Sequence, residues 1–368
     1  MSFKIINKDL LSNARTGELK LKRLTVKTPF FMPVCTNATP KAVTFEVLNN
    51  IGYEMIVSNA YHLFLRPGSE FIKKNFTNLH RFCGWEKGIL TDSGGFQIWS
   101  LGSLVKIESD GVIIKSHIDG KLNKLSPELS IQIQEDLGSD IMMIFDDCPK
   151  PDVDYSHLLS SINRTKVWAE KSKKIKKTEN LIFGIVQGGI YKSLRKISAK
   201  HMIDLDFDGI AIGGLGLGEG AQKTYEITND VCEILPLNKP RYSMGIGKPE
   251  DILESVSCGV DIFDCVVPTR NARNGTVFTF NGKINIKNSK NLSKNYPFDE
   301  NCDCKACKNY SIGYIRHLYN CNEISAIQLM TECNLYFYNK LIEYIRFSID
   351  NGTFIEYKKN FYERYFNE

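Results

Sequence analysis

Eight short apolar segments, most of them followed directly by polar or glycine residues, limit the folds open to this 368-residue chain. Their largely continuous apolar character is typical of strands buried on both faces of a parallel sheet. Most are separated by stretches with helical periodicity. The segments lie near Phe30, Glu54, Ile89, Ile141, Leu181, Gly209, Arg241 and Asp261. Eight such β–α units within about 250 residues predict an α/β fold, the TIM (β/α) barrel. A doubly wound open sheet is the alternative.

Polar side chains and glycines follow several of the predicted strands. Because the carboxyl ends of barrel strands converge on one mouth, these groups are predicted to surround a single pocket. Carboxylates, an amide and exposed glycine backbone match the donors and acceptors of a purine edge, and an aromatic ring and a thioether can sandwich its plane. Taken singly, each could be a cap or turn residue. The groups are Asp92, Phe96, Asp146, Gln187, the backbone of residues 213–215, Met244 and Asp264.

The last predicted strand, within VDIFDCVVPTR at residues 260–270, presents Asp264 ahead of Arg270 and Arg273. A strand-end carboxylate with two guanidiniums on the following loop is how a barrel enzyme displays a nucleophile beside a phosphate-bearing substrate. A helix cap followed by two surface arginines is the alternative. Nine Lys and Arg residues but three acidic residues lie within residues 266–320, which predicts a polyanionic substrate or a solvated lysine-rich surface.

Three cysteines, Cys302, Cys304 and Cys307, are closely spaced on a turn-rich stretch. Thiolates at this spacing are typical of a tetrahedral zinc site. A fourth ligand must come from a distant element, and four protein ligands would make the zinc structural rather than catalytic. The candidates for the fourth ligand are Cys333, His317 and Cys321.

Composition narrows the protein class further. The chain is 42% hydrophobic and 24% charged, and it contains no run of the ~18 apolar residues that a membrane span needs. The amino terminus has no apolar segment typical of a signal peptide, so we expect a cytoplasmic protein without membrane association. Eleven cysteines in such a chain favour thiols and metal ligands over a disulfide framework.

Shorter segments predict additions to the barrel. Residues 3–6 and 18–26 are predicted to form a hairpin before the first barrel strand, and residues 105–108 and 112–116 a second, inserted hairpin. We expect three parts in chain order, namely a barrel with its N-terminal hairpin, a basic zinc-binding subdomain, and a C-terminal helical segment that packs back on the barrel, at residues 1–270, 271–335 and 336–368.

Several motifs resemble those of the bacterial tRNA-guanine transglycosylase family, in order and over nearly the whole chain. They are TDSGGFQ (91–97), FDDCP (145–149), GIVQGG (184–189), GGLGLGEG (213–220), MGIGKP (244–249), VDIFDCVVPTRNARNG (260–275), CDCKAC (302–307) and MTE (330–332). The resemblance implies a zinc-containing TIM barrel, assembled as a homodimer, that acts as a pentosyltransferase on tRNA. It implies that guanine at the wobble position of GUN-anticodon tRNAs (Asp, Asn, His, Tyr) is exchanged for 7-aminomethyl-7-deazaguanine (preQ1) in queuosine biosynthesis.

The resemblance also implies a role for each matching residue. Asp264 corresponds to the nucleophile, and Asp92 to the general acid/base. The groups matching the base-reading positions are Asp146, Gln187, the Gly214 backbone and the Leu215 carbonyl, which would face the substituent of the incoming base. Those matching the stacking positions are Phe96 and Met244, and those matching the RNA-contacting positions are Arg270 and Arg273.

Two features of the resemblance concern the base substituent and the metal. Cys148 beside Leu217 matches the bacterial pocket, which takes preQ1 and not queuine. The family's fourth zinc ligand is usually a histidine in the segment after MTE, whereas this chain has Cys333 there. A site of four cysteines is chemically sound, so we predict zinc held by Cys302, Cys304, Cys307 and Cys333.

Two other functions fit part of this pattern. A retaining nucleoside hydrolase or glycosidase would use the same two carboxylates, but with water rather than a base to resolve the intermediate. That reading gives no account of the basic zinc segment. A non-catalytic RNA-binding protein on the same fold would not need both Asp92 and Asp264.

Overall fold

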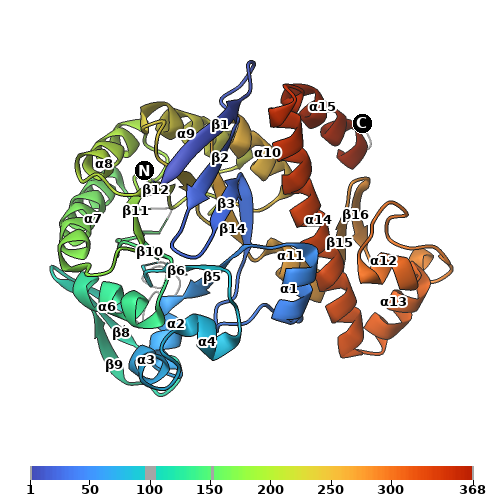
Figure 1. The fold of residues 1–368 in the computed structure, drawn as a ribbon, viewed down its shortest axis with the longest axis horizontal. Coiled ribbons are helices and arrows are strands. Elements are labelled where there is room, and N and C mark those ends of the chain that lie inside the picture. Colours follow the sequence, from blue (N-terminus) through green and yellow to red (C-terminus); the bar gives the residue numbers. More distant parts are fainter. Residues whose placement is uncertain (1, 96–104, 151–152, 367–368) are drawn as a thin grey trace.

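A computed structural model describes residues 2–95, 105–150 and 153–366 (Figure 1). Eight parallel strands follow one another around a nearly closed barrel. In sheet order they are β4 (Phe30–Pro33), β14 (Ile262–Cys265), β13 (Arg241–Ser243), β12 (Gly209–Ile212), β11 (Leu181–Val186), β10 (Ile141–Met143), β6 (Gly88–Asp92) and β5 (Met55–Asn59). The two ends of this sheet meet where Val34 pairs with Val57 and the Cys35 N–H donates to the Val57 carbonyl at 2.7 Å. The predicted barrel is therefore confirmed, and the alternative of a doubly wound open sheet is excluded.

Helices surround the strands, as Figure 1 shows. Along the barrel they are α1 (Phe45–Ile51), α2 (Ala60–Leu65), α3 (Ser69–Phe76), α4 (Leu79–Cys83), α6 (Pro127–Leu137), α7 (Tyr155–Ile175), α8 (Lys192–Asp204), α9 (Ala221–Ile234), α10 (Pro249–Ser257) and α11 (Val267–Arg273). Strands β5 and β12 are buried along their whole length, which explains their continuous apolar sequence. Ser126 caps α6 by accepting the Leu129 N–H, with Pro127 in the first turn, as the sequence predicts.

Each predicted two-stranded hairpin is a three-stranded sheet in the structure. The N-terminal sheet consists of β1 (Phe3–Lys8), β2 (Arg15–Lys20) and β3 (Thr25–Thr28). Residues 18–26 are thus two strands, because the Leu21 N–H bonds the Leu24 carbonyl and closes a turn between them. The inserted sheet consists of β7 (Val105–Glu108), β8 (Gly111–Lys115) and β9 (Leu122–Leu125).

The C-terminal third adds a smaller unit beside the barrel. It contains β15 (Thr276–Thr279), β16 (Gly282–Asn285), η2 (Ser289–Asn291), α12 (Lys305–Asn309), α13 (Ile312–Asn320), α14 (Ile324–Asp350) and α15 (Phe354–Phe366). Helix α14 serves both cores, because Met330 and Cys333 belong to the small one and Leu335 onward to that of the barrel. The three-part division of the chain stays a prediction.

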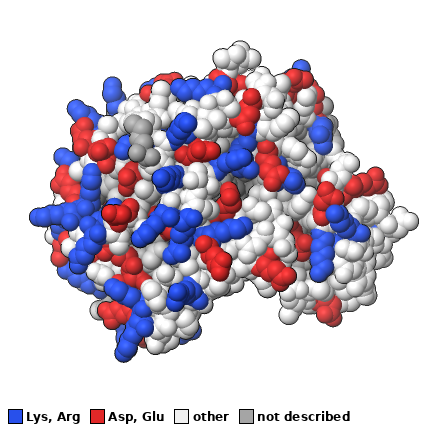
Figure 2. Space-filling view, viewed as in Figure 1, with Lys and Arg blue, Asp and Glu red and all other residues white. Residues whose placement is uncertain are grey.

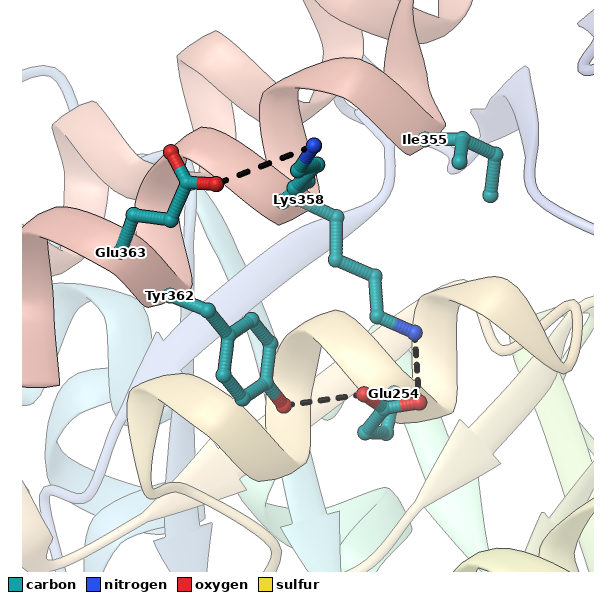
Figure 3. Close-up of a pocket in the computed structure, with 6 residues that line it drawn as sticks. Glu254, Ile355, Lys358, Tyr362 and Glu363 are labelled. Atoms are coloured by element: carbon teal, nitrogen blue, oxygen red, sulfur yellow. Dashed lines mark hydrogen bonds and ion pairs between the residues drawn. The ribbon is translucent and has the colours of Figure 1, made fainter. Parts of the chain in front are cut away.

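Helix α15 packs back on α10 through a polar contact (Figure 3). Glu254 accepts hydrogen bonds from Lys358 Nζ at 2.6 Å and from Tyr362 Oη at 2.9 Å. The hollow between the helices is therefore lined by groups that satisfy one another. Within the described ranges, no helix combines the length and apolar character needed to cross a bilayer.

The charged side chains on one face are mixed in sign. In the view of Figure 2, Lys and Arg lie dispersed among Asp and Glu over the barrel half of the molecule. Surface ion pairs account for part of this mixing, as with Lys124 and Asp110 at 2.8 Å. Exposed pairs of this kind contribute little to stability, so the fold depends on its buried contacts.

A buried ion pair holds the N-terminal sheet to the barrel. Arg15 on β2 donates from Nε to Asp261 Oδ1 at 2.9 Å and from Nη2 to Oδ2 at 2.6 Å. The same guanidinium donates to the carbonyls of Leu237 and Lys239, and Asp261 also accepts the Arg241 N–H. Both side chains are almost fully buried, so neither has water as a substitute partner.

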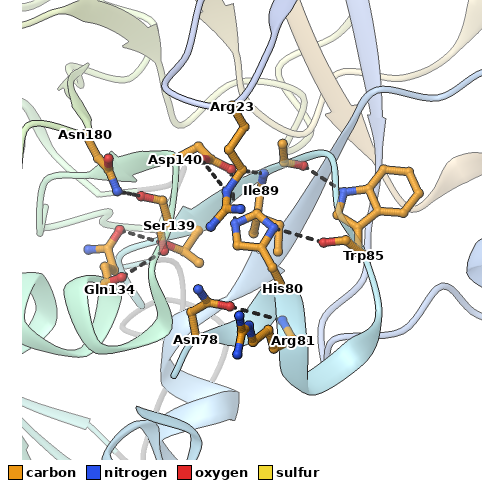
Figure 4. A network of polar contacts seen from close by, with 12 residues as sticks. Arg23, Asn78, His80, Arg81, Trp85, Ile89, Gln134, Ser139, Asp140 and Asn180 are labelled. Carbon is orange, nitrogen blue, oxygen red and sulfur yellow. Dashed lines mark hydrogen bonds and ion pairs between the residues drawn. The ribbon is translucent and has the colours of Figure 1, made fainter. Parts of the chain in front are cut away.

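A second polar network lies at the amino end of β6 (Figure 4). Asp140 accepts the Ile89 N–H at 2.9 Å and lies 3.2 Å from His80 Nε2. Arg23, from the turn between β2 and β3, reaches the same carboxylate at 3.3 Å but stays 38% exposed. The exposed Arg23 contact is a useful comparison for the buried Arg15 pair.

Replacing Arg15 tests how much the buried pair stabilises the fold. We expect Arg15→Met to lower the free energy of unfolding by about 3–5 kcal/mol, because it leaves the Asp261 carboxylate buried without a cation. Urea unfolding at pH 7 measures the change. Arg23→Met is the matched control and should cost less than about 1 kcal/mol. Equal, small losses in the two variants would contradict this account.

Candidate functional site

The predicted strand-end residues lie at one rim of the barrel because all eight strands run parallel. Asp92 and Asp264 lie at the carboxyl ends of β6 and β14. The others follow directly after their strands, namely Asp146 and Cys148 after β10, Gln187 after β11, Gly214 and Leu215 after β12, and Met244 after β13. Phe96, predicted to stack on a base, lies outside the described residues.

Asp264 is held by one of its two carboxylate oxygens. Oδ1 accepts hydrogen bonds from the Tyr242 hydroxyl at 2.6 Å and from the Gly245 N–H at 2.8 Å. Among the described residues, nothing donates to Oδ2 within hydrogen-bond distance. Burial raises the pKa of Asp264 above its ordinary value, while the two hydrogen bonds oppose that rise. The carboxylate is thus fixed in place through Oδ1, and no described residue occupies Oδ2.

Asp92 accepts three hydrogen bonds from neutral donors. Asn59 Nδ2 donates at 2.5 Å, and the N–H groups of Ala60 and Gly94 donate at 3.2 and 3.3 Å. Burial raises the pKa of Asp92 to about 7, and the nearby Asp264 charge adds to that rise. A carboxyl group with this pKa can both donate and accept a proton at neutral pH.

Asp146 and Gln187 form a buried pair between neighbouring strands. Gln187 Nε2 donates to Asp146 Oδ2 at 2.7 Å. Burial raises the pKa of Asp146 to about 7; the Gln187 bond opposes the rise and the adjacent Asp147 supports it. A Cβ atom at Gly95 would lie 2.1 Å from Asp146 Oδ1, so only glycine lets this carboxylate occupy its position.

The two glycines after β12 make room for the Gln187 amide. A Cβ atom at Gly213 would lie 2.8 Å from Gln187 Nε2, and one at Gly214 would lie 2.5 Å from Oε1. Gly214 also has φ of +65°, a conformation that strains other residues. The Gln187 amide therefore packs directly against the backbone of Gly213 and Gly214. With no side chains there, the peptide groups of these glycines stay uncovered at the strand end.

Residues 215–219 form the next part of the site, where a carboxylate binds two backbone N–H groups. Leu215 is buried, while Glu219 accepts the N–H groups of Gly216 at 2.5 Å and Leu217 at 2.9 Å. Cys148 is also buried, and burial raises the pKa of its thiol, so it stays neutral at pH 7.

Arg270 and Arg273 lie on a helix, which corrects the prediction that they follow the strand on a loop. Helix α11 has Pro268 in its first turn, a position that proline favours because its missing N–H is not needed there. Both arginines are exposed, and among the described residues neither lies within ion-pair distance of an acidic group. Their guanidiniums are available to a ligand outside the protein.

Four cysteine thiols come together in the C-terminal unit. The Sγ atoms of Cys302, Cys304, Cys307 and Cys333 all lie within 4.8 Å of one another. Cys307 and Cys333 are separated by 3.8 Å, close to the ~3.8 Å edge of a tetrahedron whose metal–sulfur distances are about 2.3 Å. The donor set therefore fits zinc. His317 and Cys321 lie outside this cluster, exposed on α13.

Three residues of the site had no predicted role. Tyr242 lies inside a strand, Arg195 lies on the buried face of α8, and Glu219 follows a run of glycines. Arg195 is 1% exposed, and its amphipathic helix offered a signal, because a buried arginine needs many acceptors. A tyrosine in a short buried strand offers no comparable signal.

Comparisons with known proteins identify the family of this chain. The family model described as queuine tRNA-ribosyltransferase matches residues 9–367. The chain is 50% identical to a queuine tRNA-ribosyltransferase of Thermoanaerobacter sp. (strain X514), over 99% of this chain and 98% of that protein. Similar proteins of the same name occur in Caldanaerobacter subterraneus subsp. tengcongensis, at 48% identity over 100% and 98%, and in Buchnera aphidicola subsp. Acyrthosiphon pisum, at 46% over 99% and 98%. The family predicted from the motifs is confirmed, and this chain belongs to the queuine tRNA-ribosyltransferases.

Proposed function

We propose that this protein is a tRNA-guanine transglycosylase that replaces guanine at the wobble position of GUN-anticodon tRNAs with preQ1, by double displacement. The observation that carries the proposal is the placement of Asp264, Asp92 and the Asp146–Gln187 pair at the rim of one barrel. The first two supply a nucleophile and a proton carrier, and the third reads a base.

The first displacement uses the free oxygen of Asp264. Oδ2 attacks the anomeric carbon of the ribose opposite the leaving guanine, and the C–N glycosidic bond breaks as the new C–O bond forms. Tyr242 and Gly245 hold Oδ1 and keep the carboxylate aimed. The product is an aspartyl–ribosyl ester in an unbroken RNA backbone.

Asp92 handles the proton in both displacements. With a pKa raised to about 7 by burial, a large share of Asp92 is protonated at neutral pH. It donates its proton as guanine leaves and removes one from the incoming base, which then attacks the anomeric carbon and releases Asp264. Two inversions retain the configuration of the ribose, as in retaining glycosidases.

Asp146 and Gln187 present complementary groups to a guanine edge. A carboxylate accepts from both the ring N–H and the exocyclic amine, and the Gln187 amide can face an oxo group. Met244 and Phe96 are proposed to enclose the ring plane.

The orientation of one peptide supports an aminomethyl substituent. Because Glu219 binds the Gly216 N–H, the Leu215 carbonyl of the same trans peptide points the opposite way and can accept from an ammonium group. The neutral Cys148 thiol beside this position leaves room without adding charge.

The basic segment after Asp264 is proposed to hold the RNA. Arg270 and Arg273 are exposed just beyond the nucleophile, within the stretch of nine basic and three acidic residues. Zinc bound by Cys302, Cys304, Cys307 and Cys333 would keep that stretch folded, without taking part in the chemistry. We extend the proposal to a cytoplasmic homodimer, on the family resemblance.

A hydrolase on the same barrel is the rival function. It would resolve the Asp264 ester with water, and it has no need of the Asp146–Gln187 pair or of the exposed arginines beside the nucleophile. Incubating the protein with tRNA and labelled guanine separates the two, because only a transglycosylase incorporates label and only a hydrolase leaves an abasic site.

Replacing Asp264 tests the nucleophile. Asp264→Asn should keep its fold and tRNA affinity but lose guanine exchange by about 10³-fold or more, because an amide cannot form the ester. Denaturing gels of protein, tRNA and a base analogue should show a covalent adduct for the wild type only. Asp204→Asn, an exposed carboxylate at the end of α8, is the matched control and should form the adduct normally. An adduct persisting in Asp264→Asn would place the nucleophile elsewhere.

The pKa of Asp146 predicts how guanine affinity depends on pH. The carboxylate form accepts two hydrogen bonds from guanine, and burial raises its pKa to about 7. The Kd for guanine should therefore be lowest above pH 7.5 and rise roughly tenfold per pH unit below pH 7. Titrations from pH 5.5 to 8.5 measure it.

Two variants identify the group responsible for that dependence. Asp92→Asn should keep the pH dependence of guanine binding, since Asp92 handles the proton rather than the base. Asp146→Asn should bind guanine weakly at every pH, at a cost of about 2–3 kcal/mol. A dependence that vanishes in Asp92→Asn, or that persists in Asp146→Asn, would contradict the assignment.

Metal analysis tests the zinc ligands. Cys333→Ala should lose most of its zinc, unfold at lower temperature and bind tRNA more weakly, while guanine binding at the barrel persists. His317→Ala, on the exposed face of α13, is the matched control and should keep its zinc. Full zinc occupancy in Cys333→Ala with loss in His317→Ala would show that the histidine is the fourth ligand.

A further inference from the structure

Arg195 is a buried guanidinium whose hydrogen bonds to the described residues all go to backbone carbonyls. It projects from α8 and is 1% exposed. Nε donates to Gly189 at 2.8 Å, Nη1 donates to Val186 at 3.0 Å and Gly213 at 2.7 Å, and Nη2 donates to Gly214 at 3.3 Å. Across the described ranges no carboxylate lies within ion-pair distance of it. A buried cation is costly, so four aligned carbonyls are the partners that make this position tolerable.

The four carbonyls belong to two neighbouring strand ends. Val186 ends β11 and Gly189 lies just beyond Gln187, whereas Gly213 and Gly214 follow β12. One turn along α8 from Arg195, Ser198 Oγ accepts the Gln187 N–H at 3.0 Å. One helix face therefore fixes both segments that carry the proposed base-reading groups.

The direction of these hydrogen bonds determines which peptide groups after β12 face the pocket. In a trans peptide the carbonyl and the N–H point in opposite directions. Because the Gly213 and Gly214 carbonyls are drawn toward Arg195, the N–H groups of Gly214 and Leu215 point away from α8, toward the inside of the barrel rim. These two peptides, Gly213–Gly214 and Gly214–Leu215, thus present donors rather than acceptors.

Burial lowers the pKa of Arg195 to about 10, yet it leaves the guanidinium charged at neutral pH. Its planar fork matches several carbonyls at fixed angles, which a lysine ammonium does not. The positive charge also makes rotation of either peptide unfavourable, since a turned peptide would bring an N–H against the guanidinium.

We infer that Arg195 is a positioning residue for base selection. It orients the Gly214 and Leu215 N–H groups so that the pocket takes a purine with an oxo group at C6 and disfavours one with an amino group there. The inference rests on the proposed function, because it assumes that the ligand of this rim is a guanine-type base.

The test compares two free bases that differ at C6. Guanine carries an oxo group and 2,6-diaminopurine an amino group, and the Kd of each is measured for the wild type, Arg195→Met and Arg195→Lys. The matched control is Lys196→Met, an exposed neighbour on α8. Circular dichroism, melting temperature and the Kd for tRNA are recorded for every protein.

We expect the wild type and Lys196→Met to prefer guanine strongly. Arg195→Met should lose about tenfold or more of that preference while its Kd for tRNA changes less than about twofold, because loss of charge-assisted hydrogen bonds frees the peptides to turn. Arg195→Lys should lie between them. If Arg195→Met does not fold, the ratio in Arg195→Lys decides.

A preference unchanged in a folded Arg195 variant would overturn the inference. So would equal weakening of guanine, 2,6-diaminopurine and tRNA together with a lower melting temperature, since that result indicates general structural support. Failure of the wild type to exchange guanine into tRNA would refute the proposed function. The ratio of the Kd values for the two bases would still test the role of Arg195.

Discussion

The partial or complete withdrawal of three carboxylates from water at one end of the barrel is the constraint on which the site depends, with Asp146 buried and Asp92 and Asp264 half-buried. Asp92, Asp146 and Asp264 accept hydrogen bonds from neutral donors, chiefly the side chains of Asn59, Gln187 and Tyr242. Neutral donors hold a carboxylate in place without cancelling its charge, so burial still raises each pKa. A site arranged in this way retains groups that change protonation near neutral pH, which base exchange requires.

Carboxylates at the amino ends of the strands have different partners. Asp261 pairs with Arg15, and Asp140 lies against His80 and Arg23. There the cations offset the burial of the charge and tie the N-terminal sheet to the barrel. Carboxylates with raised pKa at one end and ion-paired carboxylates at the other match the general separation of catalysis and stability in barrels of this kind.

The periodicity of the sequence predicts the strands and the rim of the barrel. It predicts few of the side-chain contacts between distant segments. Apolar runs followed by Asp92, Asp146 or Asp264 locate both the strands and the rim, because a parallel barrel brings all strand ends together. Arg195 and Tyr242 lie inside predicted elements, where composition alone predicts only burial. Their partners lie on other strand ends, between 6 and 22 residues away in sequence. The division of residues 18–26 into two strands likewise depends on one local turn, which a short polar stretch does not predict.

Helix α14 connects the cysteine cluster to the loop that holds Asp264. Next to Cys333, Asn334 donates from Nδ2 to the carbonyls of Pro268, in the first turn of α11, at 2.9 Å and of Thr276, just after that helix, at 3.0 Å. One turn further, the Tyr338 hydroxyl donates to the Gly247 carbonyl at 2.5 Å, just after the loop whose N–H holds Asp264. A metal that fixes Cys333 therefore also restrains α11, which carries Arg270 and Arg273. We therefore propose that zinc in this unit would support the helix proposed to contact RNA, whereas α8 holds the ends of β11 and β12.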